Sequence, residues 1–384
     1  MKKRSLLVAS LLVAAALVIA GSVPLTASAA EPTTEAPSYV LVEARTGTVL
    51  AEKNAREHRP IASMVKIMTL LLTFESMDAG ELSENETLTV SENASSMGGS
   101  QAFLDAHADY RAGELIKSVV VASANDSCVA LAERMNGSVD AFVERMNERA
   151  AALGMEDTNF VNCTGLPAPN QYSCARDAAV MFGELIKHKG FFDYSREWMF
   201  DLVHPSGRVT TLTNTNRMIR SYEGCDGGKT GFTNEAMYCL SATAERGGTR
   251  LIGVITGAET SKSRNAEMAK LFDHGFAGWA TEQVIFGGIP FGSPLEVPGS
   301  KEGSVTVAPA ENAYVLSRRG EKEETELVTE IWDDISLPLP AGSKVGKIKA
   351  VCGGKTVAET YLVTTSDLHE KSYLDIVGDL INGM

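Results

Sequence analysis

Residues 60–72 read Pro-Ile-Ala-Ser-Met-Val-Lys-Ile-Met-Thr-Leu-Leu-Leu, a stretch whose apolar spacing predicts a largely buried helix beginning at Ser63. Ser63 and Lys66 lie three residues apart and therefore share one face of that helix. Burial disfavours the ammonium form of lysine, and a neutral amine beside a hydroxyl can serve as general base for a nucleophile. Alone, however, a Ser-x-x-Lys pattern is more typical of a capping serine followed by a lysine that reaches solvent.

The first thirty residues have the pattern of an export signal. Three basic residues at positions 2–4 precede an apolar run at 6–20, and small residues at 27–30 resemble a cleavage site. We expect residues 1–29 to be a cleaved signal peptide, with an uncleaved N-terminal anchor as the alternative. The chain is then exported, extracytoplasmic, and located in the cell wall or at the outer face of the cytoplasmic membrane.

Composition excludes several classes of protein. The net charge is −14 and no basic run occurs, so the chain is not built for nucleic acid. After the first 30 residues, no stretch approaches the roughly 20 apolar residues of a membrane span. A chain of 384 residues is long enough for two domains.

Six cysteines are too few for a disulfide scaffold of this length, and none forms the C-x-x-C pairs of a zinc site. Cys225 and Cys239 flank a predicted hairpin, which makes them the best candidates for a disulfide, with buried free thiols as the alternative. The cysteines are Cys128, Cys163, Cys174, Cys225, Cys239 and Cys352.

Strand patterns stand at both ends of residues 31–282, with helical patterns between them. We predict strands near 39–51 and 227–257, and a strand followed by a loop over 88–97. The predicted helices after the first are 113–121, 126–135, 138–153, 176–187 and 263–279. This order predicts an α+β domain, an antiparallel sheet flanked by helices with a helical subdomain.

The sequence pattern changes after that domain. Short β-rich runs over 283–370, separated by glycine, proline and charged residues, predict a small all-β C-terminal domain. Residues 371–384 form a short amphipathic tail, which we expect to pack against its own domain, with peripheral membrane contact as the alternative.

Two further short motifs accompany Ser63 and Lys66. Ser123-x-Asn125 alone is typical of a turn that caps a helix, and Lys229-Thr230-Gly231 alone is typical of a strand end. Together, in this order, the three motifs form the set found in penicillin-binding proteins and class A β-lactamases. The chain resembles the low-molecular-mass penicillin-binding proteins that act as serine D-alanyl-D-alanine carboxypeptidases. The resemblance extends from Ser38 to Trp279 and includes residues 165–167, 172–177, 215–217 and 226–233.

That resemblance implies a covalent mechanism. Ser63 would attack the carbonyl between the two D-alanines of a peptidoglycan stem peptide, forming an acyl-enzyme that water hydrolyses. Lys66 would take the serine proton as general base, and Ser123 would relay a proton to the leaving amine. The pKa of Lys66 must fall by about three units for this role, and we expect burial and the charge of Lys229 to lower it.

The resemblance also implies how substrate is held. Asn125 would bind the substrate amide, and Lys229 and Thr230 would bind the terminal carboxylate. Gly231 would let substrate approach the strand closely. The backbone N–H groups of Ser63 and Phe232 would form the oxyanion hole. We expect β-lactams to act as inhibitors, and no metal or cofactor to be required.

Two alternatives remain open at this point, a class A β-lactamase and a non-hydrolytic sensor or wall-binding module, and a third is excluded. A class A β-lactamase needs a glutamate with an asparagine four residues later, whereas Glu156 is followed by Phe160 at that position. A non-hydrolytic penicillin sensor, or a wall-binding module, would keep the acylating serine without turnover. A P-loop is excluded at Gly228-Lys229-Thr230 because Glu223 stands where the first glycine is required.

Overall fold

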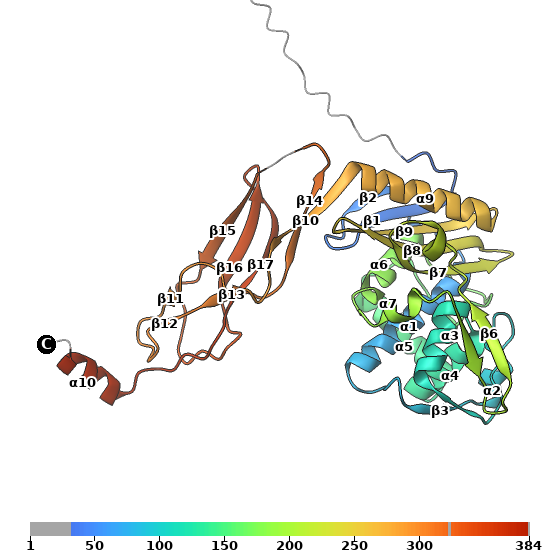
Figure 1. Cartoon of the computed structure of the whole chain (residues 1–384), viewed down its shortest axis with the longest axis horizontal. Helices are drawn as coiled ribbons and strands as arrows, with labels where there is room; N and C mark the ends of the chain where they lie inside the picture. The colour runs from blue at the N-terminus through green and yellow to red at the C-terminus, as the bar shows by residue number, and fades with distance from the viewer. Residues whose placement is uncertain (1–31, 322–323, 383–384) are drawn as a thin grey trace, which may run out of the picture. The chain divides into compact units, whose positions relative to one another are not determined.

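The computed structural model describes residues 32–321 and 324–382 (Figure 1). The expected signal peptide lies outside these residues. No helix within the described part of the chain is long and apolar enough to cross a membrane.

The first domain is built on a five-stranded antiparallel sheet with the order β2-β1-β9-β8-β7. β1 pairs with β9, so strands more than 200 residues apart in the sequence lie side by side. The strands are β1 (Ser38–Glu43), β2 (Val49–Lys53), β7 (Cys225–Thr233), β8 (Met237–Arg246) and β9 (Thr249–Ala258). This sheet joins both ends of the domain, as the sequence predicts.

Helices cover both faces of this sheet. α9 (Ser261–Gly278) packs on one face, and α6 (Ala175–Leu185) lies against the other (Figure 1). Alternate residues of β9 serve the two faces: Ile252 and Val254 join the larger core, and Leu251 and Ile255 join the core under α9. This alternation is what a strand buried on both faces requires.

The helical subdomain surrounds α1 (Lys66–Asp78), which is apolar on almost every side and buried from Lys66 to Phe74. A helix that is hydrophobic all round is stable only in the interior, and this one lies at the centre of the larger core. A short 3₁₀ turn, η1 (Ala62–Val65), leads into it. The surrounding helices are α3 (Ala112–Ala122), α4 (Asn125–Asn136) and α5 (Val139–Ala152).

Several short elements complete the first domain. The expected strand and loop over 88–97 is wrong in its second half, where the chain forms a short helix. Ser91 caps that helix by accepting a hydrogen bond from the Ala94 N–H at 2.9 Å, which favours the helical turn. The remaining elements are β3 (Thr87–Thr89), α2 (Glu92–Ser95), β4 (Asp109–Arg111), α7 (Phe191–Ser195), β5 (Met199–Val203), β6 (Val209–Thr213) and α8 (Met218–Ser221).

The C-terminal region is β-rich, and this part of the fold prediction is confirmed. Its four-stranded sheet has the order β13-β17-β16-β15 and buries a small core that includes Val345, Ile348 and Leu362. The expected boundary between residues 282 and 283 falls inside β10. The elements are β10 (Trp279–Ile285), β11 (Leu295–Glu296), β12 (Ser304–Val305), β13 (Val307–Pro309), β14 (Ala313–Arg318), β15 (Thr325–Ile331), β16 (Lys344–Cys352), β17 (Lys355–Thr364) and α10 (Tyr373–Asn382).

Two expectations about side chains are wrong. Tyr373 and Leu374 at the start of α10 are 80% and 78% exposed, so these tail residues do not pack against the domain. All six cysteines are free and buried. Cys225 lies opposite Ala244 and Cys239 lies opposite Gly231, which separates the two thiols by roughly 20 Å along the hairpin. A disulfide needs Cα atoms about 4.4–6.8 Å apart, so this pair cannot form.

Candidate active site

Ser63 lies in η1, on a backbone that two glycines approach closely. A Cβ on Gly165 would lie 2.0 Å from the Ala62 carbonyl oxygen, and one on Gly231 would lie 3.2 Å from the Ser63 nitrogen. Ala62 itself has a positive φ of 47°, an unusual conformation for a residue with a side chain. The Ala62–Ser63 peptide is therefore held between two segments that only glycine allows so close.

Lys66 begins α1 and is fully buried, with its amine beside the serine. Its Nζ lies 3.1 Å from Ser63 Oγ and 2.5 Å from the Thr164 carbonyl oxygen. Burial lowers the pKa of Lys66 to about 8, against opposing effects of Cys128, Cys163 and Asp126. The pair predicted from the sequence is thus in contact, and near physiological pH this lysine has a far larger neutral fraction than an ordinary lysine.

The Thr164 carbonyl is set by the chain around it. Cys163 O accepts hydrogen bonds from Thr69 Oγ1 at 2.8 Å and from the Cys128 thiol at 3.0 Å. Asn162 Oδ1 accepts from the Thr164 N–H at 3.1 Å. This loop therefore presents one carbonyl oxygen to Lys66, a partner that no side-chain motif could have revealed.

The second motif joins the first from the end of α3. Ser123 is the C-cap of that helix in a left-handed conformation with φ 63°, and it is buried. Asn125 begins α4, and its Nδ2 donates to the Gly98 carbonyl at 2.6 Å. Asn125 Oδ1 is buried and has no hydrogen-bond partner among the described residues, so it remains available as an acceptor.

Lys229 on β7 connects this motif to the sheet. Its Nζ donates to Ser123 Oγ at 2.8 Å and to the Thr230 carbonyl at 3.1 Å. Burial and then the charge of Lys66 hold the pKa of Lys229 well below its ordinary value. We expected the charge of Lys229 to lower the pKa of Lys66. In the structure the effect runs the other way: the charge of Lys66 lowers the pKa of Lys229, and burial is what lowers the pKa of Lys66.

A cleft of about 870 Å³ opens beside these groups. Ser63, Ser123 and the strand segment 230–232 line it, so members of all three motifs reach one cavity. None of the described residues that line it is an aspartate, glutamate or histidine. The cleft therefore offers hydroxyls, amides and cations, and no carboxylate that could serve as a base.

Three cations at this cleft were not predicted from the sequence as site residues: Arg217, Lys262 and Arg264. Arg264 is 5% exposed, donates to Asn265 Oδ1 and the Cys239 carbonyl, and has no carboxylate partner in the described structure. Burial, helped by the charge of Arg217, lowers the pKa of Arg264 to about 10. A buried guanidinium without a counter-ion favours an anionic ligand. A single arginine in the first turns of α9 carries no motif, which is why sequence patterns missed it.

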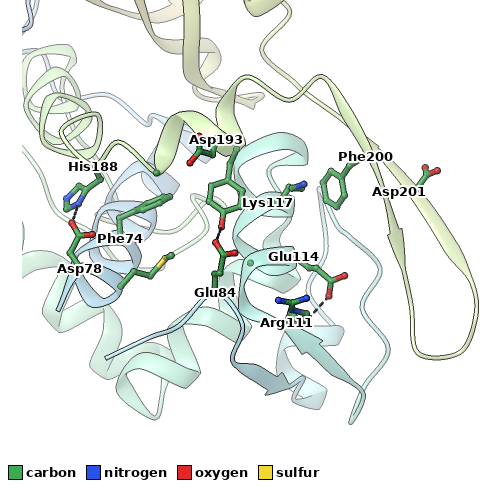
Figure 2. A pocket seen from close by; sticks show the side chains of 14 residues that line it. Phe74, Asp78, Glu84, Arg111, Glu114, Lys117, His188, Asp193, Phe200 and Asp201 are labelled. Atoms are coloured by element: carbon green, nitrogen blue, oxygen red, sulfur yellow. Dashed lines mark hydrogen bonds and ion pairs between the residues drawn. The ribbon is translucent and has the colours of Figure 1, made fainter. Parts of the chain in front are cut away.

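A second cavity, of about 660 Å³, lies between the end of α1, α3, α7 and β5 (Figure 2). None of the predicted site residues lines it. Figure 2 shows some of its polar groups bonded to one another, including His188 and Asp78, whose Nδ1 and Oδ2 lie 2.6 Å apart. Glu84 accepts a hydrogen bond from Tyr194 at 3.1 Å. This cavity is separate from the three motifs and is not the candidate active site.

Comparison with known proteins agrees with the geometry. A family model described as D-alanyl-D-alanine carboxypeptidase matches residues 25–260. The chain belongs to this family. A second model, the C-terminal domain of penicillin-binding protein 5, matches residues 281–370. The family inferred from the three motifs is confirmed.

Individual relatives extend the agreement over nearly the whole chain. D-alanyl-D-alanine carboxypeptidase DacF of Bacillus subtilis is 36% identical over 341 residues, covering 88% of this chain and 87% of the relative. Penicillin-binding protein 5 of Haemophilus influenzae superposes with a TM-score of 0.72 at 30% identity, over 88% of this chain and 99% of that one. Ampicillin-bound penicillin-binding protein D2 of Listeria monocytogenes gives a TM-score of 0.57 at 31% identity, over 64% of this chain and 98% of that one.

The β-lactamase alternative is not favoured. Glu156, the glutamate that such an enzyme would use, is exposed and pairs with Arg56 at 3.1 Å. The matched C-terminal domain is also additional to a β-lactamase.

Proposed function

We propose that this family member removes the terminal D-alanine from peptidoglycan stem peptides through an acyl-enzyme on Ser63. The contact that carries the proposal is the one between the buried Lys66 amine and Ser63 Oγ, at 3.1 Å. A base with a pKa of about 8 can accept the serine proton near neutral pH, whereas an ordinary lysine cannot.

Acylation follows from the positions of these groups. Lys66 takes the Ser63 proton while Oγ bonds to the carbonyl carbon of the penultimate D-alanine. The carbon–nitrogen bond then breaks, and the leaving amine receives that proton from Lys66 through Ser123, which returns Lys66 to its neutral form. The backbone N–H groups of Ser63 and Phe232 stabilise the oxyanion, since Gly231 brings the two backbone segments together.

Deacylation needs a base for the incoming water. Because no carboxylate or histidine lines the described cleft, we assign this role to Lys66 as well. Water donates its proton to Lys66, attacks the ester carbon, and releases the shortened peptide as Ser63 recovers its proton.

The terminal carboxylate is bound by Lys229, Thr230 and Arg264. The free protein holds Lys229 with a low pKa beside Ser123. An incoming carboxylate stabilises the ammonium form, so substrate favours the charged form of Lys229. That charge then lowers the pKa of Lys66 further, which couples recognition of the carboxylate to activation of the base. Asn125 Oδ1, unpaired among the described residues, accepts the substrate amide N–H.

β-Lactams occupy the same site by acylating Ser63. The test is intact mass of the mature protein after exposure to penicillin, together with D-alanine release from a diacyl-D-Ala-D-Ala peptide. We expect one adduct that is lost in Ser63→Ala, and release of D-alanine by the wild type. An adduct that persists in Ser63→Ala contradicts the assignment of the nucleophile. Rapid β-lactam hydrolysis without D-alanine release would indicate a β-lactamase, and a stable adduct with neither would indicate a sensor.

We place the catalytic domain at residues 31–282 and the β-rich domain at 283–370, and locate the mature chain outside the cytoplasmic membrane after loss of residues 1–29. Ile376, Tyr373 and Leu374 give α10 an exposed apolar surface, which supports peripheral membrane contact. Flotation of the full mature chain with lipid vesicles tests this location. We expect co-flotation that Leu374→Asp weakens, and no co-flotation by the wild type contradicts it.

A further inference from the structure

Loop 98–105 reaches the cleft at Ser100 and contacts Asn125. Ser100 lines the cleft, and its carbonyl accepts the Asn125 N–H at 2.7 Å. Gly98 O holds the Asn125 side chain, and a Cβ on Gly99 would lie 2.8 Å from Asn125 Nδ2. The orientation of the Asn125 amide therefore depends on where this loop lies.

The loop is fixed from inside by a buried carboxylate. Asp126 accepts the N–H groups of Ala102 at 3.0 Å and Leu104 at 3.1 Å. Between these two bonds Phe103 has a positive φ of 60° and is 56% exposed. A bulky residue in this conformation is strained, so it needs contacts that hold it.

Those contacts come from the tip of the β5–β6 hairpin. Arg208 Nη2 donates to the Phe103 carbonyl and to Asp105 Oδ1, the latter at 2.7 Å. Ser206 Oγ donates to Asp105 Oδ2 at 2.8 Å. Every acceptor of these bonds belongs to the strained end of the loop.

Two buried side chains, Tyr110 and His204, also connect loop 98–105 to the tip of the hairpin. Tyr110 Oη accepts the Asp105 N–H at 3.0 Å and lies 2.7 Å from Nδ1 of His204, which is 1% exposed. His204 Nε2 lies 2.8 Å from Thr210 Oγ1 on β6. The hairpin tip and the loop are thus joined by buried as well as exposed bonds.

The hairpin is a firm support because its other end belongs to the cleft. β6 runs through Thr213 into Asn214 and Thr215, all of which line the cavity. Thr230 Oγ1 donates to Thr215 Oγ1 at 2.8 Å, and Asn214 Nδ2 donates to the Glu197 carbonyl at 2.9 Å. The hairpin therefore connects loop 98–105, which its tip contacts, to residues 213–215, which line the cleft.

We propose that Arg208 is a positioning residue for the carboxypeptidase reaction: through the Phe103 carbonyl and Asp105 it holds loop 98–105, and thereby Asn125, in the orientation that receives the substrate amide. This inference rests on the role given to Asn125 under the proposed function. The ion pair with Asp105 is partly exposed, so it adds little to folding stability and its effect is on geometry.

A double-mutant cycle on the full mature chain tests this, with kcat/KM for a diacyl-D-Ala-D-Ala peptide as the readout. We expect Asn125→Ala to lower kcat/KM by about 30-fold, since it removes a buried hydrogen bond to substrate. Arg208→Ala should lower it by about fivefold, with Arg208→Lys between that variant and the wild type. In the Asn125→Ala background, Arg208→Ala should have no further effect, because it acts only through Asn125.

Arg134→Ala is the matched control. Its side chain is 41% exposed, as is that of Arg208, and it pairs with Glu86 in the same domain. We expect its kcat/KM to equal that of the wild type. If Arg208→Ala does not fold, Asp105→Asn replaces it in the same cycle, with an expected loss of about threefold.

The outcomes distinguish the positioning role of Arg208 from the substrate-binding role of Asn125. An unchanged kcat/KM in Arg208→Ala, or losses that multiply in the double mutant, overturns the positioning role alone. An unchanged kcat/KM in Asn125→Ala removes the substrate-binding role of Asn125 and the positioning role with it.

Discussion

The chain contains two similar short stretches, and they lie in very different surroundings. Residues 225–231 read Cys-Asp-Gly-Gly-Lys-Thr-Gly on β7, and residues 352–356 read Cys-Gly-Gly-Lys-Thr at the β16–β17 hairpin. Lys229 is 2% exposed and bonds to Ser123, whereas Lys355 is exposed beside a turn of two glycines with positive φ.

The two lysines therefore differ in chemistry, although they share a local sequence. Burial and a neighbouring amine lower the pKa of Lys229 well below its ordinary value. Gly353 and Gly354 instead form the tight connection of a hairpin, for which positive φ at both positions is suited. We therefore expect a Gly-Lys-Thr sequence to bind a carboxylate only where the fold brings Ser123 and the cleft to it.

The largest effect should come from removing Lys66, the proposed base, whose amine lies near the first of these two stretches. We expect Lys66→Met, which removes the amine without leaving a large cavity, to slow acylation by penicillin about 10³-fold. Lys355→Met should acylate like the wild type. Rapid-quench mixing followed by mass spectrometry of the intact protein measures both acylation rates. Thermal unfolding checks that the variants are folded. An unchanged rate in Lys66→Met would remove this residue as the base.

Removing the two compared lysines tests the contrast directly. Lys229→Met should lower kcat/KM for a D-Ala-D-Ala peptide by about 100-fold, since a charge-assisted hydrogen bond to the terminal carboxylate is lost. Lys355→Met should leave it unchanged. Steady-state D-alanine release measures both. Equal effects of the two substitutions would show that the shared sequence, and not its surroundings, determines the role.

Much of this contrast could be predicted from the sequence. The three motifs and the missing glycine after Thr356 distinguish the stretches, and periodicity predicts the buried helix behind Ser63. Predictions failed where long-range register decides the outcome. Cys225 and Cys239 belong to neighbouring strands, yet their partners are Ala244 and Gly231.

Other parts of the site carry no sequence pattern that could reveal them. Thr164 contributes a backbone carbonyl, which any residue possesses, and its position depends on Cys163 and Asn162. Arg264 lies at the cleft as a buried cation without a carboxylate partner among the described residues, and its burial follows from the packing of α9 on the sheet. Such features become visible only when distant segments are assembled.

The pH dependence should sharpen the comparison by a smaller effect. Lys66 acts as a base only when neutral, and its pKa is lowered to about 8. We expect kcat/KM to rise about tenfold per pH unit below that value and to level off above it. If bound carboxylate favours the charged form of Lys229, as we propose, the rise of kcat with pH should occur at lower pH than the rise of kcat/KM. Lys355→Met should have the same pH profiles of kcat and kcat/KM as the wild type. A rise of both at the same pH would contradict the coupling between the two buried lysines.

The smallest effect concerns Cys225 and Cys352, the cysteines with which the two stretches begin. All six thiols are free, so denaturation without reductant, followed by alkylation, should add six labels to the protein. A disulfide that closed a loop of about 15 residues would stabilise the fold by about 3 kcal/mol. We therefore expect reductant to leave the Tm unchanged, and Cys225→Ser and Cys352→Ser to respond to reductant in the same way as the wild type. Four labels instead of six, with a Tm that falls in reductant in the wild type and not in Cys225→Ser, would show that Cys225 is cross-linked in the folded protein. If peptide mapping identified Cys239 as its partner, the hairpin would have a different register, and the placement of Lys229 beside Ser123 would have to be revised.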